Sequence, residues 1–517
     1  MKRNNLTTAI LAGITGVAGI ASVSNAVNLN SDGLGQVLVY PYYTVNNSIN
    51  TLISVVNTTD EAKAVKVRFL EGKNSRECLD FNLYLSPYDV WTSGLVPVTD
   101  ASGAAVNTKI VTTDNSCTAP AVNNLEFLPF AFTGNFADGI GSSLERCTEG
   151  HFEMIEMGIV QHNDAVTGIA APAANYVSDA DYNAILHGAS GIPGNCPKIV
   201  GNWSPGVSQW DTPSINIGNP TGGLFGSATL INVDAGTVVS YNADAIEDFT
   251  STLNHSDPGS LFPSLKTGDN STSNIFNNGA VVTDTWSNSA VYNGTAAGVV
   301  SGTTSGVQAV SALYMHDHIY GEYEITSGIN AKTEWVVTFP TKFAYVDVVG
   351  NAFGSTAVGL GTVANIPTMP FTTAISSIGA CESYSVSGLF DREEQFPTTP
   401  LGDVIPSPRP PGVVVAGPIF CWETNVLQFD KDLAATGDSL VLGSKNTTHL
   451  PTPFNNGWVA LQFNQATAAT DTGANIYTGL PVTGFAVQEY ANGALASGLL
   501  ANYAGLFAHK YSKNIAP

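Results

Sequence analysis

The segment 315–318 (MHDH) carries the sharpest chemical pattern in the chain. In an extended strand, side chains two positions apart lie on the same face, so His316 and His318 could bind one metal ion. Glu322 or Glu324 could add a carboxylate oxygen. The H-x-H pattern is short, and no third histidine lies near it in sequence. The alternative is a pair of polar side chains near a turn.

Two other segments match known site motifs only in part. Ser190 lies within HGASG (187–191), which lacks the G-x-S-x-G spacing of a nucleophilic serine. The segment 179–183 (DADYN) opens like a calcium loop, but Ala184 stands where glycine is needed and Ser190 where a bidentate glutamate is needed. Irregular calcium sites built from Asp and Asn loops have no fixed spacing. Calcium therefore stays open as a ligand, and no other cofactor is indicated.

Charged and aromatic clusters give further candidates. DREE (391–394) concentrates charge in a chain with few charges, and an ion pair is favoured there over two catalytic carboxylates. Glu153 and Glu156 fall on opposite faces of a regular strand, which argues against a paired-carboxylate site. Several aromatic side chains could form a sugar-stacking platform, although core packing is favoured for most of them. These residues are Tyr40, Tyr42, Tyr43, Trp91, Trp335 and Trp458.

The composition excludes some classes of partner. The chain has 517 residues, of which 44% are hydrophobic and 12% charged, which argues against disorder. Its 42 Asp and Glu against 19 Lys and Arg give a formal net charge of −23. Phosphate backbones require clustered cations, so no nucleic-acid partner is expected, and anionic membrane surfaces would repel the chain.

The first 26 residues have the pattern of a secretory signal peptide. Lys2 and Arg3 are followed by an apolar run over 9–21 and by the small-residue cleavage pattern SNA at 24–26. No later apolar run reaches the about 20 residues that a spanning helix needs, so no transmembrane segment is expected after signal removal. We therefore expect a secreted protein, extracellular or on the outer cell surface, with the periplasm as the other compartment.

Six cysteines follow the signal, and an even number in an oxidising compartment predicts disulfide bonds. Six cysteines allow 15 pairings, which sequence cannot distinguish. Pairing of neighbours is our working prediction, and each bridge would contribute about 3–4 kcal/mol in the chain-entropy model. The predicted pairs are Cys78–Cys117, Cys147–Cys196 and Cys381–Cys421.

Alternating patterns predict a mainly β fold with antiparallel sandwich-like packing, long irregular insertions and few short helices. The clearest stretch is 51–91, where 51–56, 63–69 and 80–85 read as three consecutive antiparallel strands of a meander. In 63–69 the apolar residues alternate with Lys66 and Arg68, the pattern of a half-buried strand. Such a sheet needs a second sheet to cover its apolar face.

The first segment of the expected mature chain, 27–44, has two interpretations. It is either the first strand of the sandwich, which we favour, or an arm that pairs with the open edge of a neighbouring subunit. The length of the chain indicates more than one domain.

We expect an N-terminal sandwich-like domain over 27–215 and a second β-rich region over 216–517. The second region would contain a Ser/Thr/Asn/Gly-rich insertion at 252–306, expected to be a surface excursion, and a Pro-rich loop at 397–411.

Segments spread over most of the expected mature chain carry a family resemblance. They are 33–45 (GLGQVLVYPYYTV), 51–91, 152–158 (FEMIEMG), 333–347 (TEWVVTFPTKFAYVD), 391–395 (DREEQ) and 484–493 (GFAVQEYANG). Together they resemble a family of secreted or cell-surface proteins of proteobacteria that has no established activity. The resemblance implies secretion and imports no catalytic residues.

These features favour a non-catalytic structural protein: a surface-layer, filament or extracellular-matrix subunit that associates with itself. The first alternative is a secreted module that binds carbohydrate, such as cell-surface glycans, or another ligand, with or without calcium. The second is an extracellular hydrolase.

Overall fold

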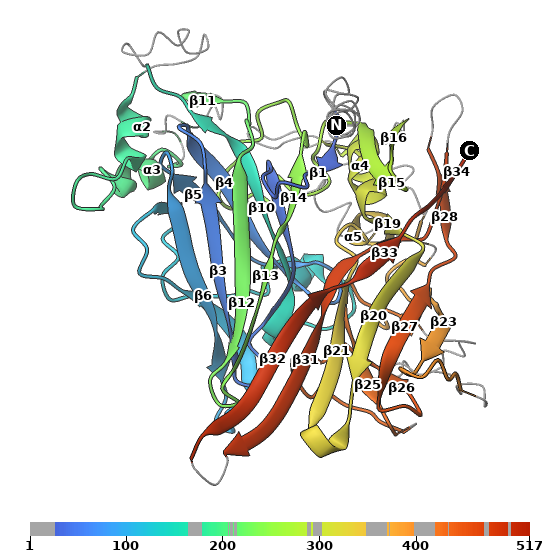
Figure 1. The fold of residues 1–517 in the computed structure, drawn as a ribbon. Helices are drawn as coiled ribbons and strands as arrows, with labels where there is room; N and C mark the ends of the chain where they lie inside the picture. The colour runs from blue at the N-terminus through green and yellow to red at the C-terminus, as the bar shows by residue number, and fades with distance from the viewer. Residues whose placement is uncertain are drawn as a thin grey trace, which may run out of the picture.

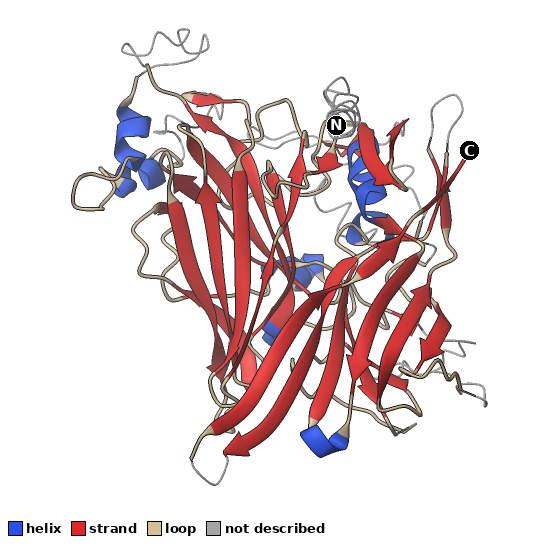
Figure 2. Cartoon of the chain, in the orientation of Figure 1, coloured by secondary structure: helices blue, strands red, loops and turns tan. Residues whose placement is uncertain are grey.

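The structure is a computed structural model and is mainly β, as the sequence predicts (Figures 1 and 2). It describes residues 26–163, 178–204, 206, 210, 215–286, 291–292, 302–347, 370–371, 373–397, 419–432, 434–469, 475–494 and 498–517. The expected signal peptide lies outside the described residues except for Ala26, and so does most of the Pro-rich loop.

Two sheets form the first sandwich. The first sheet, in spatial order, contains β1 (Asn28–Leu29), β14 (Asp244–Glu247), β2 (Val37–Thr44), β10 (Glu149–Val160), β4 (Ala62–Glu71), β5 (Glu77–Leu85) and β8 (Cys117–Ala119), and β11 (Ile217–Gly218) pairs with β10. The second sheet contains β13 (Thr237–Asn242), β12 (Leu224–Asn232), β3 (Ile49–Asn57), β6 (Val90–Thr99), β7 (Ala105–Val111) and β9 (Leu125–Glu126).

Two further sheets form the second sandwich. The third sheet contains β26 (Thr447–Pro451), β25 (Thr424–Asp430), β21 (Ala331–Thr338), β31 (Thr483–Ala494) and β32 (Leu500–Ala508). The fourth contains β23 (Ser385–Phe390), β27 (Asn456–Gln462), β20 (His318–Glu324) and β33 (Lys510–Ser512). Strand pairs are antiparallel in both sheets except β25–β26, which is parallel.

Short elements connect and flank these sheets. The small β elements are β15 (Thr272–Asn277) with β16 (Ala280–Thr285), β17 (Val291–Tyr292) with β18 (Gly302–Thr303), β19 (Met315–His316) with β30 (Leu480–Pro481), β22 (Glu382–Ser383) with β24 (Ile419–Phe420), and β28 (Ala466–Ala468), β29 (Ile476–Thr478) and β34 (Asn514–Ala516). The helices are η1 (Phe130–Phe132), η2 (Gly134–Phe136), η3 (Leu144–Thr148), α2 (Ala180–Ile185), α3 (Cys196–Gly201), α4 (Thr304–Tyr314), η5 (Ser327–Ile329) and α5 (Phe343–Val346).

The third sheet is a middle layer that joins the two sandwiches. Val336 and Phe485 on one of its faces belong to the core of the first sandwich, where the Phe485 ring stacks on Tyr241 at 4.8 Å between centroids. Trp335 and Leu427 on its other face belong to the core shared with the fourth sheet. Because both faces are covered by apolar side chains, the two sandwiches form one continuous packed structure (Figure 1).

The predicted meander over 51–91 is wrong at its first connection. β3 pairs with β12 and β6 in the second sheet, whereas β4 pairs with β10 and β5 in the first. The chain therefore crosses between sheets after Asn57. Strands of both sheets in a sandwich turn an apolar face toward the same core. Alternation therefore cannot tell whether two successive strands pair in one sheet or lie in opposite sheets.

The interpretation of 27–44 as an intrinsic strand is confirmed. β2 lies inside the first sheet, between β14 and β10 of the same chain.

Strand pairing also shows how the two expected regions, 27–215 and 216–517, are connected. β12, β13 and β14, which follow residue 215, complete both sheets of the first sandwich, so strand pairing does not stop at that position.

Six paired cysteines are confirmed, but two of the three predicted pairings are wrong. The bonds are Cys78–Cys147, Cys117–Cys196 and Cys381–Cys421, and only the last joins neighbours. Cys78 begins β5 beside β4, and Cys147 lies in η3, immediately before β10 on the other side of β4. Sheet order, and not distance along the chain, therefore brought these residues together. Their sequence separations of 69 and 79 correspond to about 4 kcal/mol each in the chain-entropy model.

Candidate functional site

The two histidines of the predicted metal pair lie in different sheets. His316 ends β19 and is buried against Tyr511, at 4.1 Å between ring centroids, with Nδ1 3.2 Å from the Val482 carbonyl oxygen. Burial holds the pKa of His316 well below its ordinary value. His318 begins β20 in the fourth sheet, with Nδ1 3.0 Å from Asp317 Oδ2.

The two glutamates predicted to add a carboxylate oxygen, Glu322 and Glu324, do not join the histidines in a metal site. Glu322 is exposed on β20, and Glu324 accepts a hydrogen bond from the backbone N–H of Thr326 (2.8 Å). Among the described residues, no group of three or more His, Cys, Asp and Glu side chains is arranged to hold a metal ion.

The segment that opens like a calcium loop forms α2 and uses its buried carboxylate internally. Asp181 accepts hydrogen bonds from Lys198 Nζ (2.5 Å), Asn202 Nδ2 (2.8 Å) and Asn216 Nδ2 (2.9 Å). Ser190 is exposed, while the His187 ring faces Ser86 Oγ (2.9 Å). Neither the loop nor a Ser–His pair is therefore assembled here.

The charge cluster at 391–394 contains the predicted ion pair. Arg392 Nε lies 2.9 Å from Glu393 Oε1, with the two side chains 72% and 58% exposed. Glu153 and Glu156 are buried and separated, since Glu153 pairs with Arg68 and Glu156 with Lys63.

Core packing is confirmed for five of the six aromatic candidates, all of which are fully buried: Tyr40, Tyr42, Tyr43, Trp91 and Trp335. Trp458 differs, because its side chain is 41% exposed on the outer face of the fourth sheet. Its ring stacks on Phe390 of the neighbouring strand at 5.0 Å between centroids and 19° between planes. Trp458 is thus the one sugar-stacking candidate that solvent can reach.

The polar face of β4 is buried, which the half-buried pattern did not predict. On this face Lys66 pairs with Asp80 (3.0 Å), and Arg68 with both Glu77 and Glu153. Lys63, on the opposite face with Val65, is also buried and pairs with Glu156 (2.8 Å). The segment after β14 covers part of this face, because Lys66 Nζ donates to the carbonyl oxygens of residues 257 and 258 and Asn82 Nδ2 to that of residue 256. The start of the expected insertion is therefore a packed cover and not a surface excursion.

The sequence carries a signal for this cluster that the alternation of apolar residues along β4 does not reveal. Lys66 and Arg68 share one face of β4, and the acidic residues Asp80 and Glu153 lie in the strands that flank it. Oppositely charged side chains on paired strands are a cross-strand signature. Recognising it required the strand order β10-β4-β5, which only the fold supplies.

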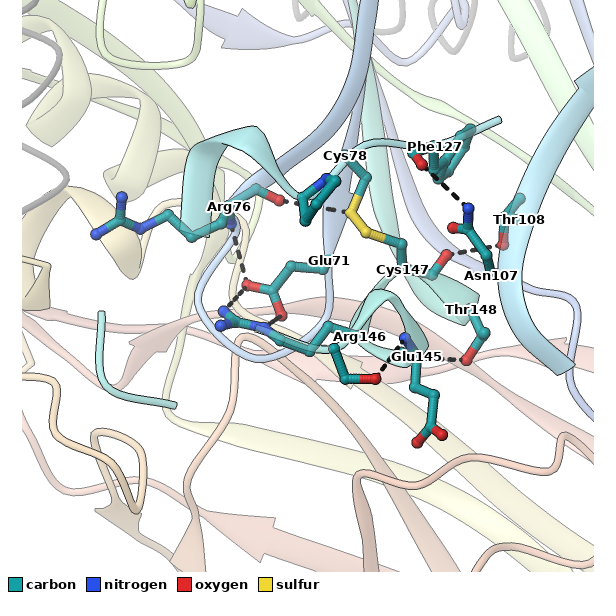
Figure 3. Close-up of a disulfide and its surroundings, with 12 residues drawn as sticks. Glu71, Arg76, Cys78, Asn107, Thr108, Phe127, Glu145, Arg146, Cys147 and Thr148 are labelled. Atoms are coloured by element: carbon teal, nitrogen blue, oxygen red, sulfur yellow. Dashed lines mark hydrogen bonds and ion pairs between the residues drawn. A yellow bond between two sulfur atoms is a disulfide. The ribbon is translucent and has the colours of Figure 1, made fainter. Parts of the chain in front are cut away.

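A second charge network lies near the Cys78–Cys147 disulfide, and Figure 3 shows its Glu71–Arg146 pair. Arg146 donates to Glu71 (Nη2–Oε1 2.8 Å) and to Asp138 (Nη2–Oδ2 2.7 Å). Arg76 pairs with Asp347 (Nε–Oδ2 2.7 Å), which directly follows α5 in the second half of the chain. Buried charges are stable only when paired. The Arg146 contacts thus hold segments of the first sandwich together, and the Arg76–Asp347 pair links this sandwich to the second half of the chain.

The cavity beside these charges is too small for catalysis on an organic substrate. Arg68, Arg76, Glu77, Lys266 and Asp347 line a space of about 40 Å³. Burial lowers the pKa of Lys266 to about 7, and burial raises the pKa of Glu77. The space has room for a few water molecules, whereas ligand pockets usually measure about 300–1,000 Å³.

No family model matches the sequence, and neither the curated proteins nor the solved structures include one that is significantly similar to this chain. None of the helices in the described residues has the length and apolar character needed to cross a bilayer. Function must therefore be inferred from the site itself.

One open hollow is rich in carboxylate and amide oxygens. It measures about 600 Å³, and its lining includes Asp248, Asp269 and Asn270. Asp269 already accepts hydrogen bonds from the backbone N–H and the hydroxyl of Ser251 (3.0 and 3.2 Å), and Asn270 Nδ2 donates to the Asp248 carbonyl oxygen (3.0 Å). The Asp269 carboxylate and the Asn270 amide are therefore engaged in hydrogen bonds with neighbouring segments of the chain.

The other open hollow lies on the outer face of the second sheet and measures about 570 Å³. Its lining combines aliphatic and hydroxyl side chains and includes Leu52, Ser54, Thr92, Gly94 and Val111. No titratable side chain lines it. The hollow exists because Gly94, between Leu52 of β3 and Val111 of β7, has no side chain. This surface suits contact with another molecule, and its lining supplies no acid or base that could activate its hydroxyl groups.

Proposed function

We propose that this protein is a secreted, non-catalytic structural component of the cell surface or extracellular matrix, a surface-layer or filament subunit. One contrast carries the proposal. The ion pairs Arg68–Glu77 at β4 and Arg76–Asp347 at the junction of the sandwiches are buried beside a space of only about 40 Å³. The hollow of about 570 Å³ has no titratable side chain in its lining, and in the acidic hollow of about 600 Å³ Asp269 is held by Ser251. The buried ionisable groups thus stabilise the fold, and the uncharged hollow is suited to contact.

Three further observations support a location outside the cytoplasm. The six cysteines are paired in disulfides, which persist in oxidising compartments. The N-terminal residues have the signal-peptide pattern, and the chain resembles a secreted proteobacterial family. We therefore also propose that the chain belongs to this family of secreted or cell-surface proteins.

The test is the assembly state of the mature protein. Size-exclusion chromatography with light scattering and negative-stain electron microscopy, with and without calcium, should reveal ordered assemblies. Fractionation of the native cells should place the protein outside the inner membrane. A monomer at all accessible concentrations, or protein retained in the cytoplasm, would contradict the proposal.

A second candidate function is glycan binding at Trp458. The Trp458 ring lies over Gly388, where a Cβ atom would be 3.3 Å from the ring, and Glu322 on the adjacent strand is exposed beside it. An aromatic face next to a carboxylate offers stacking area and a hydrogen-bond acceptor to a pyranose ring.

Affinity electrophoresis against a panel of polysaccharides tests this candidate. Retardation that Trp458→Ala abolishes, and that exposed Phe276→Ala on β15 leaves unchanged, would favour it. Absence of retardation by every polysaccharide would remove it.

A further inference from the structure

We propose that the outer face of the second sheet is the surface through which two copies of this chain associate, face to face around a two-fold axis. The inference rests on the proposed structural function and names the interface that it requires. We call this surface, formed by the outward residues of β13, β12, β3, β6 and β7, the neutral face.

Charge is the first reason to expect a second copy as the occupant. The chain carries a formal net charge of −23, so two copies repel each other over most approaches. Lys109 is the one charged side chain among the outward residues of the five strands, which are otherwise aliphatic, aromatic, hydroxyl or amide. The Asp114 carboxylate, which follows β7, accepts hydrogen bonds from Thr92 on this face, so the face carries one positive and one negative charge and no net charge. Two acidic copies therefore meet at the lowest electrostatic cost through this face.

The neutral face also carries an exposed apolar ridge. Phe225, Val56 and Val90 are direct cross-strand neighbours on β12, β3 and β6. Phe225 is 42% exposed and Val90 46% exposed, and farther along the face Leu52 is 43% and Val238 54% exposed. A contiguous apolar surface of this kind, surrounded by hydroxyl groups, marks an interaction site.

The ridge and the hollow are adjacent, which fits a two-fold arrangement. The hollow is lined both by the row Ser227–Ser54–Thr92, which borders the ridge, and by the next row, Thr229–Leu52–Gly94. A two-fold axis along the first of these rows places the ridge of each copy over the row Thr229–Leu52–Gly94, the far side of the hollow of the other copy. Such an isologous contact uses one patch on both copies and closes after two subunits.

The sheet edge at β13 is less suited to association than the face. β32 of the third sheet runs beside β13 (Figure 1), and Asn502 Nδ2 of β32 donates to the carbonyl oxygen of Ala235 in the turn before β13. An edge covered by its own chain offers less space for strand addition by a partner. The face is therefore better suited than the β13 edge for pairing copies of this sheet.

The experiment compares the mature full chain with Leu52→Glu and Val90→Glu by sedimentation equilibrium. The wild type should form dimers or larger species, more tightly at high salt, because salt screens the repulsion between copies. Each substitution should raise the dissociation constant of the dimer by at least about 100-fold, since association would bury a carboxylate without a partner.

The matched control is Phe276→Glu, which places the same charge at a side chain that is 67% exposed on β15, outside the neutral face. It should associate like the wild type, and thermal unfolding confirms that all variants are folded. Wild-type association that both face variants retain would overturn the inference and leave the structural function standing. A wild type that is monomeric at all concentrations would overturn both.

Discussion

Removing the guanidinium of Arg146 is a direct test of the buried charge network beside the Cys78–Cys147 disulfide in the first sandwich. Arg146 donates to both Glu71 oxygens (2.8 and 3.2 Å), to both Asp138 oxygens (2.9 and 2.7 Å) and to the Gly141 carbonyl oxygen (2.7 Å). Its guanidinium also lies over the Phe132 ring, at 4.5 Å from the centroid. Arg146→Met retains an apolar side chain over Phe132 but leaves two buried carboxylates without their cation.

The expected cost at pH 7 is about 3–5 kcal/mol of unfolding free energy, the usual result of breaking a buried ion pair on one side. Burial raises the pKa of Asp138, but the hydrogen bonds and charge of Arg146 outweigh burial and hold it below its ordinary value of 3.8. In the wild type, this carboxylate therefore contributes stability that is present above about pH 4 and lost as the pH falls further.

In Arg146→Met the effect of Asp138 protonation on the stability of the folded state reverses in sign. Burial without the cation raises the pKa of Asp138 above that of the unfolded chain, so protonation favours the folded variant as the pH falls. The difference in stability between wild type and variant should therefore be largest near pH 7 and shrink toward about pH 4. Guanidinium-induced unfolding, followed by tryptophan fluorescence at both pH values, measures this difference.

A matched control and a second variant make the test specific. Arg392→Met removes the exposed partner of Glu393 and should leave stability unchanged. Adding Glu71→Gln to Arg146→Met should restore part of the loss, because it removes one uncompensated charge. A cost of less than about 1 kcal/mol at pH 7, or a cost that is the same at both pH values, would refute the reasoning.

Three further perturbations test other parts of the structure. Replacing Cys78 and Cys147 together by serine should lower the unfolding free energy by about 4 kcal/mol, and an unchanged denaturation midpoint would contradict the assigned pairing. Gly226→Ala should destabilise by about 1–3 kcal/mol, because its Cβ would overlap the Tyr40 hydroxyl in the first core; calorimetry should show a lower Tm, and an unaltered one would be inconsistent with this packing. Burial lowers the pKa of His449, but hydrogen bonds to Asp430 and Gly437 outweigh it and raise the pKa above 6.5. The contribution of His449 is therefore complete below about pH 6.5 and is lost as the pH rises through the folded-state value, so His449→Gln should cost more at about pH 5.5 than at about pH 8.5, and an equal cost would argue against a charged ring.

Local sequence pattern determined the strands and their apolar faces. Val65, Val67 and Phe69 alternate along β4 and lie in the first core as expected, because side chains alternate across any strand whatever its partner. The paired state of the six cysteines was also predictable, since it follows from their even number and the expected oxidising compartment. The partners were not, because the order β10-β4-β5 determines which cysteines meet.

The tertiary structure alone decided what covers each face and which residues share a site. Lys66 and Arg68 have the pattern of a solvated face, yet the chain near residue 257 folds over this face. The two buried cations are therefore paired with the carboxylates of Asp80 and Glu77. The hollow on the second sheet brings together Leu52, Gly94 and Thr229, which no spacing rule connects. Alternation is a property of a few adjacent residues, whereas covering a face depends on contacts between segments far apart in the chain, and these form only in the folded state.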